Sequence, residues 1–164
     1  MASIAEVQEL TSPNPFCLIT SRISDEKTNI MALSWWTYLS NSPAYIGISL
    51  SQKSLTNQLI HHAGEFGLNI VGPDLVEAAF KCGTVSGRDV DKAAAFQIVL
   101  IDAEYIATKI VKSYRVALEC NVKNFIEVDE HTFFVSEVVA IHTHPNVPQL
   151  FAFDGYQRLN TLSP

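Results

Sequence analysis

The chain has 164 residues, of which 48% are hydrophobic and 17% are charged, and its formal net charge is −6 at pH 7. This length is enough for one sizeable core and too short for two ordinary domains, so we expect a single domain over residues 1–164. The negative charge argues against binding along nucleic acid or to an anionic membrane surface, while local groups remain able to hold a small anion.

The amino-terminal segment and the cysteines bear on where the protein works. Residues 1–7 carry neither a basic stretch nor an apolar core of signal-peptide length, and no apolar run approaches the roughly 20 residues needed to cross a bilayer. We therefore predict a cytoplasmic protein. Cys17, Cys82 and Cys120 are widely separated and lack the close pairs of zinc or redox motifs, so we expect reduced, buried thiols.

The first half of the chain predicts four strands and one short helix. A polar turn at 24–27 joins the first two strands into a hairpin, and the Asn41-Ser42-Pro43 break follows the second. The helix runs from about 54 to 63, because its apolar residues return with helical spacing. The predicted strands cover residues 16–23, 28–38, 44–50 and 66–71.

The middle of the chain predicts a second helix and then becomes indistinct. Asp74 is placed as a helix cap with Glu77 three residues on, and Gly83 ends the apolar face that follows. Residues 86–96 predict a loop followed by a short helix without clear bounds. No element is assigned between that helix and about residue 114.

The last third of the chain predicts a long hairpin. Segments 114–128 and 132–144 are both rich in Val, Ile, Phe and Tyr and are separated by three polar residues. From about residue 145 the pattern is typical of a tail laid over a surface. At least six strands and two or three helices, without regular strand-helix alternation, favour a mostly antiparallel barrel with inserted helices.

One polar cluster lies where a predicted strand gives way to a helix. It consists of Ser51, Gln52, Lys53, Ser54 and Thr56, with three hydroxyls and one ammonium. The first backbone N–H groups of a helix are unpaired and carry a partial positive charge, so they attract an anion. The alternative is that Ser54 only caps the helix and Lys53 is a solvated surface charge.

A second cluster, between residues 28 and 40, mixes polar side chains with flat apolar ones. Its adjacent Trp35 and Trp36 face opposite sides of a strand, so at most one stacks on a given ring while the other packs in the core or at a subunit contact. Together the two clusters suit a planar aromatic ligand with a phosphate tail. Flavin mononucleotide (FMN) is such a molecule.

In their order and spacing these residues resemble the flavin reductase-like family of FMN-binding split barrels, and the flavoredoxin proteins within it. The resemblance covers nearly the whole chain. Its features are Pro15 with the strand 16–21; Asn29 with Ala32 and Ser34; Ser42-Pro43; Ser51, Lys53, Ser54 and Thr56; the strand 65–69; the segment 117–120; and the strand 134–142. The implied fold is an antiparallel FMN-binding split β-barrel, mostly β with inserted helices.

The resemblance also implies which residues hold the cofactor. The segment matching 29–36 lies along the isoalloxazine, where backbone N–H groups bond its N5 and O4 edge, and the segment matching 51–56 holds the phosphate. The predicted cofactor-binding residues are Asn29, Ile30, Met31, Ala32, Leu33, Ser34, Trp35, Trp36, Ser51, Gln52, Lys53, Ser54 and Thr56. Lys92 and Arg88 are further cations within reach of the phosphate, with solvated surface charge as the alternative. Tyr156 and Arg158 could cover the flavin of either subunit.

No catalytic side chain is expected, because the flavin carries the electronic step and no Ser-His-Asp or Cys-His arrangement is apparent. His142 and His144 are the candidates for guiding a nicotinamide or steadying the reduced ring. They share a strand face at a spacing that metal ligands use. No third ligand is evident, so no metal site is predicted.

The resemblance implies an FMN-binding oxidoreductase of the NAD(P)H:FMN type, in which NADH or NADPH reduces the flavin and an acceptor takes the electrons. It also implies a homodimer with the flavin near the subunit interface. The chain departs from the common pattern by lacking a Gly-Arg-Tyr element after His142. The alternatives are a flavoredoxin-type electron carrier, which exchanges electrons with a redox protein without its own NAD(P)H site, and a non-enzymatic dimeric ligand-binding module.

Overall fold

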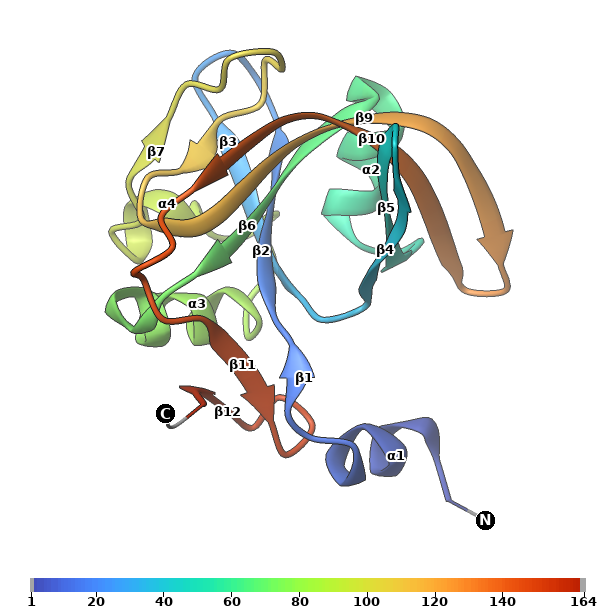
Figure 1. The fold of residues 1–164 in the computed structure, drawn as a ribbon, viewed down its shortest axis with the longest axis vertical. Coiled ribbons are helices and arrows are strands. Elements are labelled where there is room, and N and C mark those ends of the chain that lie inside the picture. The colour runs from blue at the N-terminus through green and yellow to red at the C-terminus, as the bar shows by residue number, and fades with distance from the viewer. Residues whose placement is uncertain (1, 163–164) are drawn as a thin grey trace.

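The computed structural model describes residues 2–162, and seven antiparallel strands form its main sheet (Figure 1). The order across the sheet is β3-β2-β6-β9-β10-β5-β4. These strands are β2 (Cys17–Arg22), β3 (Thr28–Leu33), β4 (Trp36–Asn41), β5 (Ala44–Ser51), β6 (Glu65–Val71), β9 (Tyr114–Val128) and β10 (His131–Thr143). The sheet is not closed, because β3 and β4 are its two edges. The predicted mostly-β, split-barrel-like architecture is confirmed.

The predicted hairpin of β9 and β10 joins the two halves of the sheet and runs as a long arc across the upper part of Figure 1. One half of β9 pairs with β6, and one half of β10 pairs with β5. Two register shifts in the hairpin, at Val135/Ser136 and Val138/Ala140, bend the strands as β-bulges do. This bending lets one hairpin serve both halves.

The strand predicted over 28–38 is wrong as a single element. It divides at Ser34 and Trp35, because its first part pairs with β2 and its second with β5. Leu33 lies opposite Cys17 of β2. Trp36 belongs to β4, the other edge strand of the sheet, and lies opposite Ile48 of β5. β-Propensity is continuous across the break and gives no sign that the pairing partner changes.

Both faces of β2 are buried, each by a separate hydrophobic cluster. In β2, Cys17 and Ile19 belong to one cluster and Leu18 to the other, as a period of two requires. Ile60 of a helix joins the first cluster, and Ala79 of another helix joins the second. All three cysteines are free and buried, as predicted.

Shorter elements complete the chain. They are α1 (Ile4–Leu10), β1 (Asn14–Pro15), α2 (Leu55–Ala63), a 3-10 turn η1 (Pro73–Leu75), α3 (Val76–Cys82), α4 (Lys92–Ala95), β7 (Leu100–Ile101), β8 (Ile110–Val111), β11 (Leu150–Phe153) and β12 (Arg158–Thr161). No helix among residues 2–162 is long and apolar enough to cross a membrane.

Two expectations about the chain's connections are wrong. Asp74 does not cap a helix, because Pro73 begins a 3-10 turn that contains Asp74, and α3 starts only at Val76. The end of the chain is not simply a tail laid over a surface, since β11 pairs with both β1 and β12 in a small sheet of its own. Leu150 and Ala152 of β11 are fully buried in the second cluster.

Candidate functional site

A cavity of about 360 Å³ lies where β3 meets the start of α2 and the connection between α3 and α4. In Figure 1, α2 and α4 lie on either side of β3. The structure brings nine of the predicted residues to this cavity: Asn29, Met31, Ala32, Ser51, Lys53, Ser54, Thr56, Arg88 and Lys92. Both polar and apolar groups therefore converge from segments far apart in the sequence.

The start of α2 forms the first wall of this cavity, which we call the phosphate cavity after the expectation that residues 51–56 hold a phosphate. Ser54 is the N-cap, and its hydroxyl accepts a hydrogen bond from the backbone N of Asn57 (3.1 Å). The hydroxyl hydrogen of Ser54 remains able to donate, so capping and anion binding are compatible roles. The buried Thr56 Oγ1 accepts from Asn29 Nδ2 (2.9 Å), which ties α2 to β3.

A buried cation forms another wall. Lys92 is only 6% exposed, and its ammonium Nζ donates to the carbonyl oxygen of Cys82 (2.7 Å). Burial lowers the pKa of Lys92 and raises the pKa of the Cys82 thiol to about 11. The thiol is therefore protonated at neutral pH, and the interpretation of Lys92 as a solvated surface charge is wrong. An ammonium has three N–H donors, so Lys92 has capacity for an anion in the cavity.

The loop between α3 and α4 closes the cavity with residues that the sequence analysis missed. It contributes Val85, Ser86 and Gly87, together with the predicted Arg88. A Cβ atom on Gly87 would lie 1.9 Å from Asn29 Oδ1, so only glycine allows this close approach. A glycine at position 87 is the one sequence feature that could have indicated a close approach in this loop. Nothing local in the sequence indicates that the residue it approaches in space is Asn29.

A second, flatter cavity of about 260 Å³ adjoins the first and shares Met31, Ala32 and Ser51 with it. Its other lining residues include Leu33, Trp35, His131 and Tyr156. The rings of Trp35 and His131 stack with their centroids 5.1 Å apart, at an interplanar angle of 30°. We call this the ring cavity, because aromatic rings and strand backbone surround a space next to the cationic one.

Four predicted residues do not line either cavity. Ile30 is fully buried in the second hydrophobic cluster, and Trp36 packs against the first, which leaves Trp35 as the tryptophan at the cavity. Ser34 is buried between β3 and β4. Gln52 is exposed, and its Nε2 donates to the carbonyl of His131 (3.4 Å).

Of the two residues near the end of the chain that were predicted to cover the flavin, one lines a cavity and the other does not. Tyr156 lines the ring cavity, and burial raises the pKa of its phenol. Arg158 instead forms an ion pair with Asp154 (3.1 Å) and lies over the ring of Phe153, 4.6 Å from its centroid. Of these two residues, only Tyr156 is therefore placed to cover a ring bound to the same chain.

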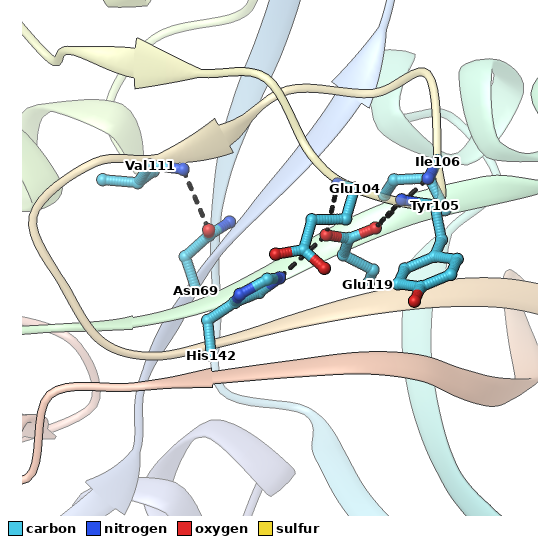
Figure 2. A network of polar contacts seen from close by, with 7 residues as sticks. All are labelled: Asn69, Glu104, Tyr105, Ile106, Val111, Glu119 and His142. Atoms are coloured by element: carbon cyan, nitrogen blue, oxygen red, sulfur yellow. Dashed lines mark hydrogen bonds and ion pairs between the residues drawn. The ribbon is translucent and has the colours of Figure 1, made fainter.

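The histidines proposed for nicotinamide guidance lie away from both cavities. His142 Nε2 lies 2.8 Å from Glu119 Oε1, and the two side chains face each other in Figure 2. His142 lies near the end of β10 opposite to His131. His144 stacks on Tyr114, with the ring centroids 4.5 Å apart. Neither residue lines the phosphate or ring cavity, so we do not retain them as functional candidates.

Glu119 is instead the anchor of a loop. Its carboxylate accepts hydrogen bonds from the backbone N–H groups of Glu104 (2.8 Å), Tyr105 (2.6 Å) and Ile106 (3.2 Å), as Figure 2 shows. Burial alone would raise the pKa of Glu119, but these donors and His142 outweigh burial and lower it. The network is thus a satisfied structural contact.

A family model described as "Flavin reductase like domain" matches residues 10–160. This chain belongs to the flavin reductase-like family. The Escherichia coli K12 protein YddH is 30% identical to it over 158 residues, which cover 93% of this chain and 83% of YddH.

Two solved structures share the fold of this flavin reductase-like chain. Flavoredoxin from Methanosarcina acetivorans superposes with a TM-score of 0.84 at 23% identity, covering 94% of this chain and 87% of that one. The Streptomyces globisporus NADH:FAD oxidoreductase SgcE6 has a TM-score of 0.85 at 18% identity, covering 99% and 95%. The names flavoredoxin and NADH:FAD oxidoreductase therefore both occur on this fold.

Proposed function

We propose that this protein binds FMN and works as an oxidoreductase that takes electrons from NADH or NADPH and passes them to an acceptor. The observation that carries the proposal is the pair of adjoining cavities, one cationic and one lined by aromatic rings. FMN combines a dianionic phosphate with a flat tricyclic ring, so its two ends match the two cavities. Family membership supports the same conclusion.

The phosphate of FMN would be held by the start of α2 and by two cations. Ser51, Ser54 and the unpaired N–H groups of the first helical turn offer donors to an anion. Lys53 lies at the exposed rim, whereas Lys92 is buried. Charge-assisted hydrogen bonds from such groups are roughly twice as strong as neutral ones.

The isoalloxazine would lie in the ring cavity along β3. β3 is an edge strand, so some of its backbone N–H groups face away from β2 and have no partner strand. These N–H groups would be available to the nitrogen and oxygen atoms of the isoalloxazine. Trp35, His131 and Tyr156 would bound the ring and limit its contact with water. When bound, the flavin supplies the hydride and electron chemistry, and the protein supplies binding, orientation and donors near the developing charge.

We also propose a cytoplasmic homodimer. The open edge strand β4 carries Tyr38 and Leu39, which are 71% and 44% exposed. The part of β9 beyond its pairing with β6 carries the exposed Phe125 and Ile126. Exposed apolar groups along a sheet edge favour association with another copy. Sedimentation equilibrium tests this, with a dimer expected and a monomer at micromolar concentration contradicting it.

The second candidate function is a flavoredoxin-type electron carrier without its own nicotinamide site, supported by the similarity in fold to flavoredoxin. Anaerobic spectra of the FMN-loaded protein before and after addition of NADH or NADPH separate the two. Bleaching of the flavin band, followed by steady-state coenzyme oxidation with an acceptor, supports the reductase. A yellow protein that neither coenzyme reduces supports the carrier, and a protein that binds no flavin supports a non-enzymatic module.

A further inference from the structure

A third cavity, of about 170 Å³, adjoins the two that we assign to FMN. It shares Ala32 with both of them, Gly83 with the phosphate cavity and Tyr156 with the ring cavity. The boundary with the phosphate cavity consists of two small residues, since a Cβ added to Gly83 would lie 3.5 Å from the Cβ of Ala32. A molecule in this side cavity would therefore lie next to the flavin site.

The lining of the side cavity selects a neutral ligand. Phe16, Ala79, Phe80 and Leu159 supply apolar walls, and none of the described residues that line it is charged. A charged ligand would lose its hydration there without an opposite charge to replace it. Two polar side chains line it. The hydroxyl of Thr84 donates to the carbonyl of Lys81 (2.9 Å), and the phenol of Tyr156 is able to bond a carbonyl or hydroxyl oxygen of a ligand.

The volume of the side cavity limits the ligand to one ring. An apolar cavity of about 150 Å³ lined by aliphatic and aromatic side chains binds benzene. The side cavity is slightly larger than this, so a single six-membered ring with one or two small substituents fits. A flavin tricycle or a nicotinamide nucleotide is too large for it and carries the wrong charge or polarity.

The side cavity also has its own approach from the surface. A groove of about 300 Å³ between α3 and β12 meets it at Phe80 and Leu159. Val76 continues the apolar lining of the groove outward, and Phe80 is 40% exposed. A ligand entering here would not pass the start of α2, so bound FMN would not block its path.

We propose that the side cavity is a binding site for a neutral one-ring compound with a carbonyl or hydroxyl oxygen, the class to which single-ring quinones belong. The oxygen would face Tyr156, and the ring would lie among Phe16, Phe80 and Leu159. Binding itself requires no flavin. Only a quinone of this class could act as an electron acceptor, taking two electrons from the reduced flavin and two protons to become a hydroquinone, and that role rests on the proposed function.

Calorimetric titration with phenol tests the site on the flavin-free protein and again on the FMN-saturated protein. Phenol is a neutral single ring with one hydroxyl, and benzoate is the charged control ligand. Leu159→Trp fills the cavity and is expected to weaken phenol binding by about tenfold or more. Leu162→Trp makes the same change at an exposed position that lines none of the cavities described here and is expected to leave binding unchanged.

The expected result is 1:1 phenol binding with or without FMN, lost in Leu159→Trp, kept in Leu162→Trp and absent for benzoate. Equal binding by both tryptophan variants, equal binding of benzoate, or displacement of phenol by FMN would overturn the proposal. If Leu159→Trp does not fold, nuclear Overhauser contacts in the native protein replace it: ring protons near the methyl groups of Ala79 and Leu159 support the site, and contacts elsewhere refute it. Because phenol binding is measured without flavin, failure of FMN to bind would be seen separately.

Discussion

Replacing Glu119 with glutamine tests whether the Glu119–His142 pair is a structural anchor. In glutamine one carboxylate oxygen becomes an NH2 group. The less costly orientation keeps the oxygen on Tyr105 and Ile106 and directs the NH2 to His142, whose Nε2 can accept in its other tautomer. One donor, the backbone N–H of Glu104, then faces the amide nitrogen without an acceptor.

An unsatisfied donor costs about 1–3 kcal/mol when it is fully buried. The Glu104 contact is part-buried, so Glu119→Gln should lower the free energy of unfolding by about 1 kcal/mol, at the low end of this range. For a chain of this length the corresponding fall in melting temperature is roughly 2–4 °C. Urea denaturation measures the loss as a lower midpoint at unchanged slope. The matched control is Glu137→Gln, which removes a partly exposed ion pair with Lys123 (2.7 Å) and should cost at most about 1 kcal/mol.

The pH dependence follows from the direction of the pKa shift. The pKa of Glu119 in the folded protein lies below its ordinary value of 4.5, so its stabilisation is complete above that value and disappears as the pH falls through the lowered pKa. The stability gap between the native protein and Glu119→Gln should therefore narrow in acid. A Glu119→Gln variant within about 0.5 kcal/mol of the native protein at neutral pH would refute this reasoning. FMN affinity should be unchanged, because the network lines neither cavity.

Three further predictions concern the phosphate cavity. Lys53→Ala should weaken FMN binding about tenfold to a hundredfold and leave riboflavin binding unchanged in fluorescence titrations, whereas Lys112→Ala, at an exposed position outside the cavity, should alter neither. Lys92→Met should weaken FMN binding by a similar factor. It should not lower the stability of the flavin-free protein in urea, since it removes a buried charge. An FMN affinity equal to that of the native protein would contradict the assignment of Lys92 to the phosphate. Gly87→Ala should displace Asn29 and reduce FMN affinity about fivefold or more. An unaltered dissociation constant would contradict this, since it would mean that the loop moves to accept the methyl group without disturbing the binding site.

The first wall of the phosphate cavity could be predicted from the sequence because its signals are local. Alternation through β5, a cap at Ser54 and a helical apolar face fix a strand-to-helix junction without reference to distant residues. The same is true of α1, where Ser3 and Glu6 form a capping box that the sequence contains but that the sequence analysis did not use.

The remaining walls depend on tertiary packing and could not be predicted. Lys92 has the same local pattern whether it is solvated or buried, and only the packing of α4 against β3 decides this. Ser34 marks the point where the chain leaves one sheet edge for the other, which no local propensity records. His142 was placed on a strand face, but its partner Glu119 also holds a loop to which no element was assigned.

The most direct test of the account is a crystal structure of the protein soaked with FMN. The account predicts that the phosphate lies at the start of α2, within hydrogen-bond distance of Lys53 or Lys92, and that the isoalloxazine lies along β3 beside Trp35. Flavin bound elsewhere, or both cavities empty at saturating FMN, would contradict the central claim.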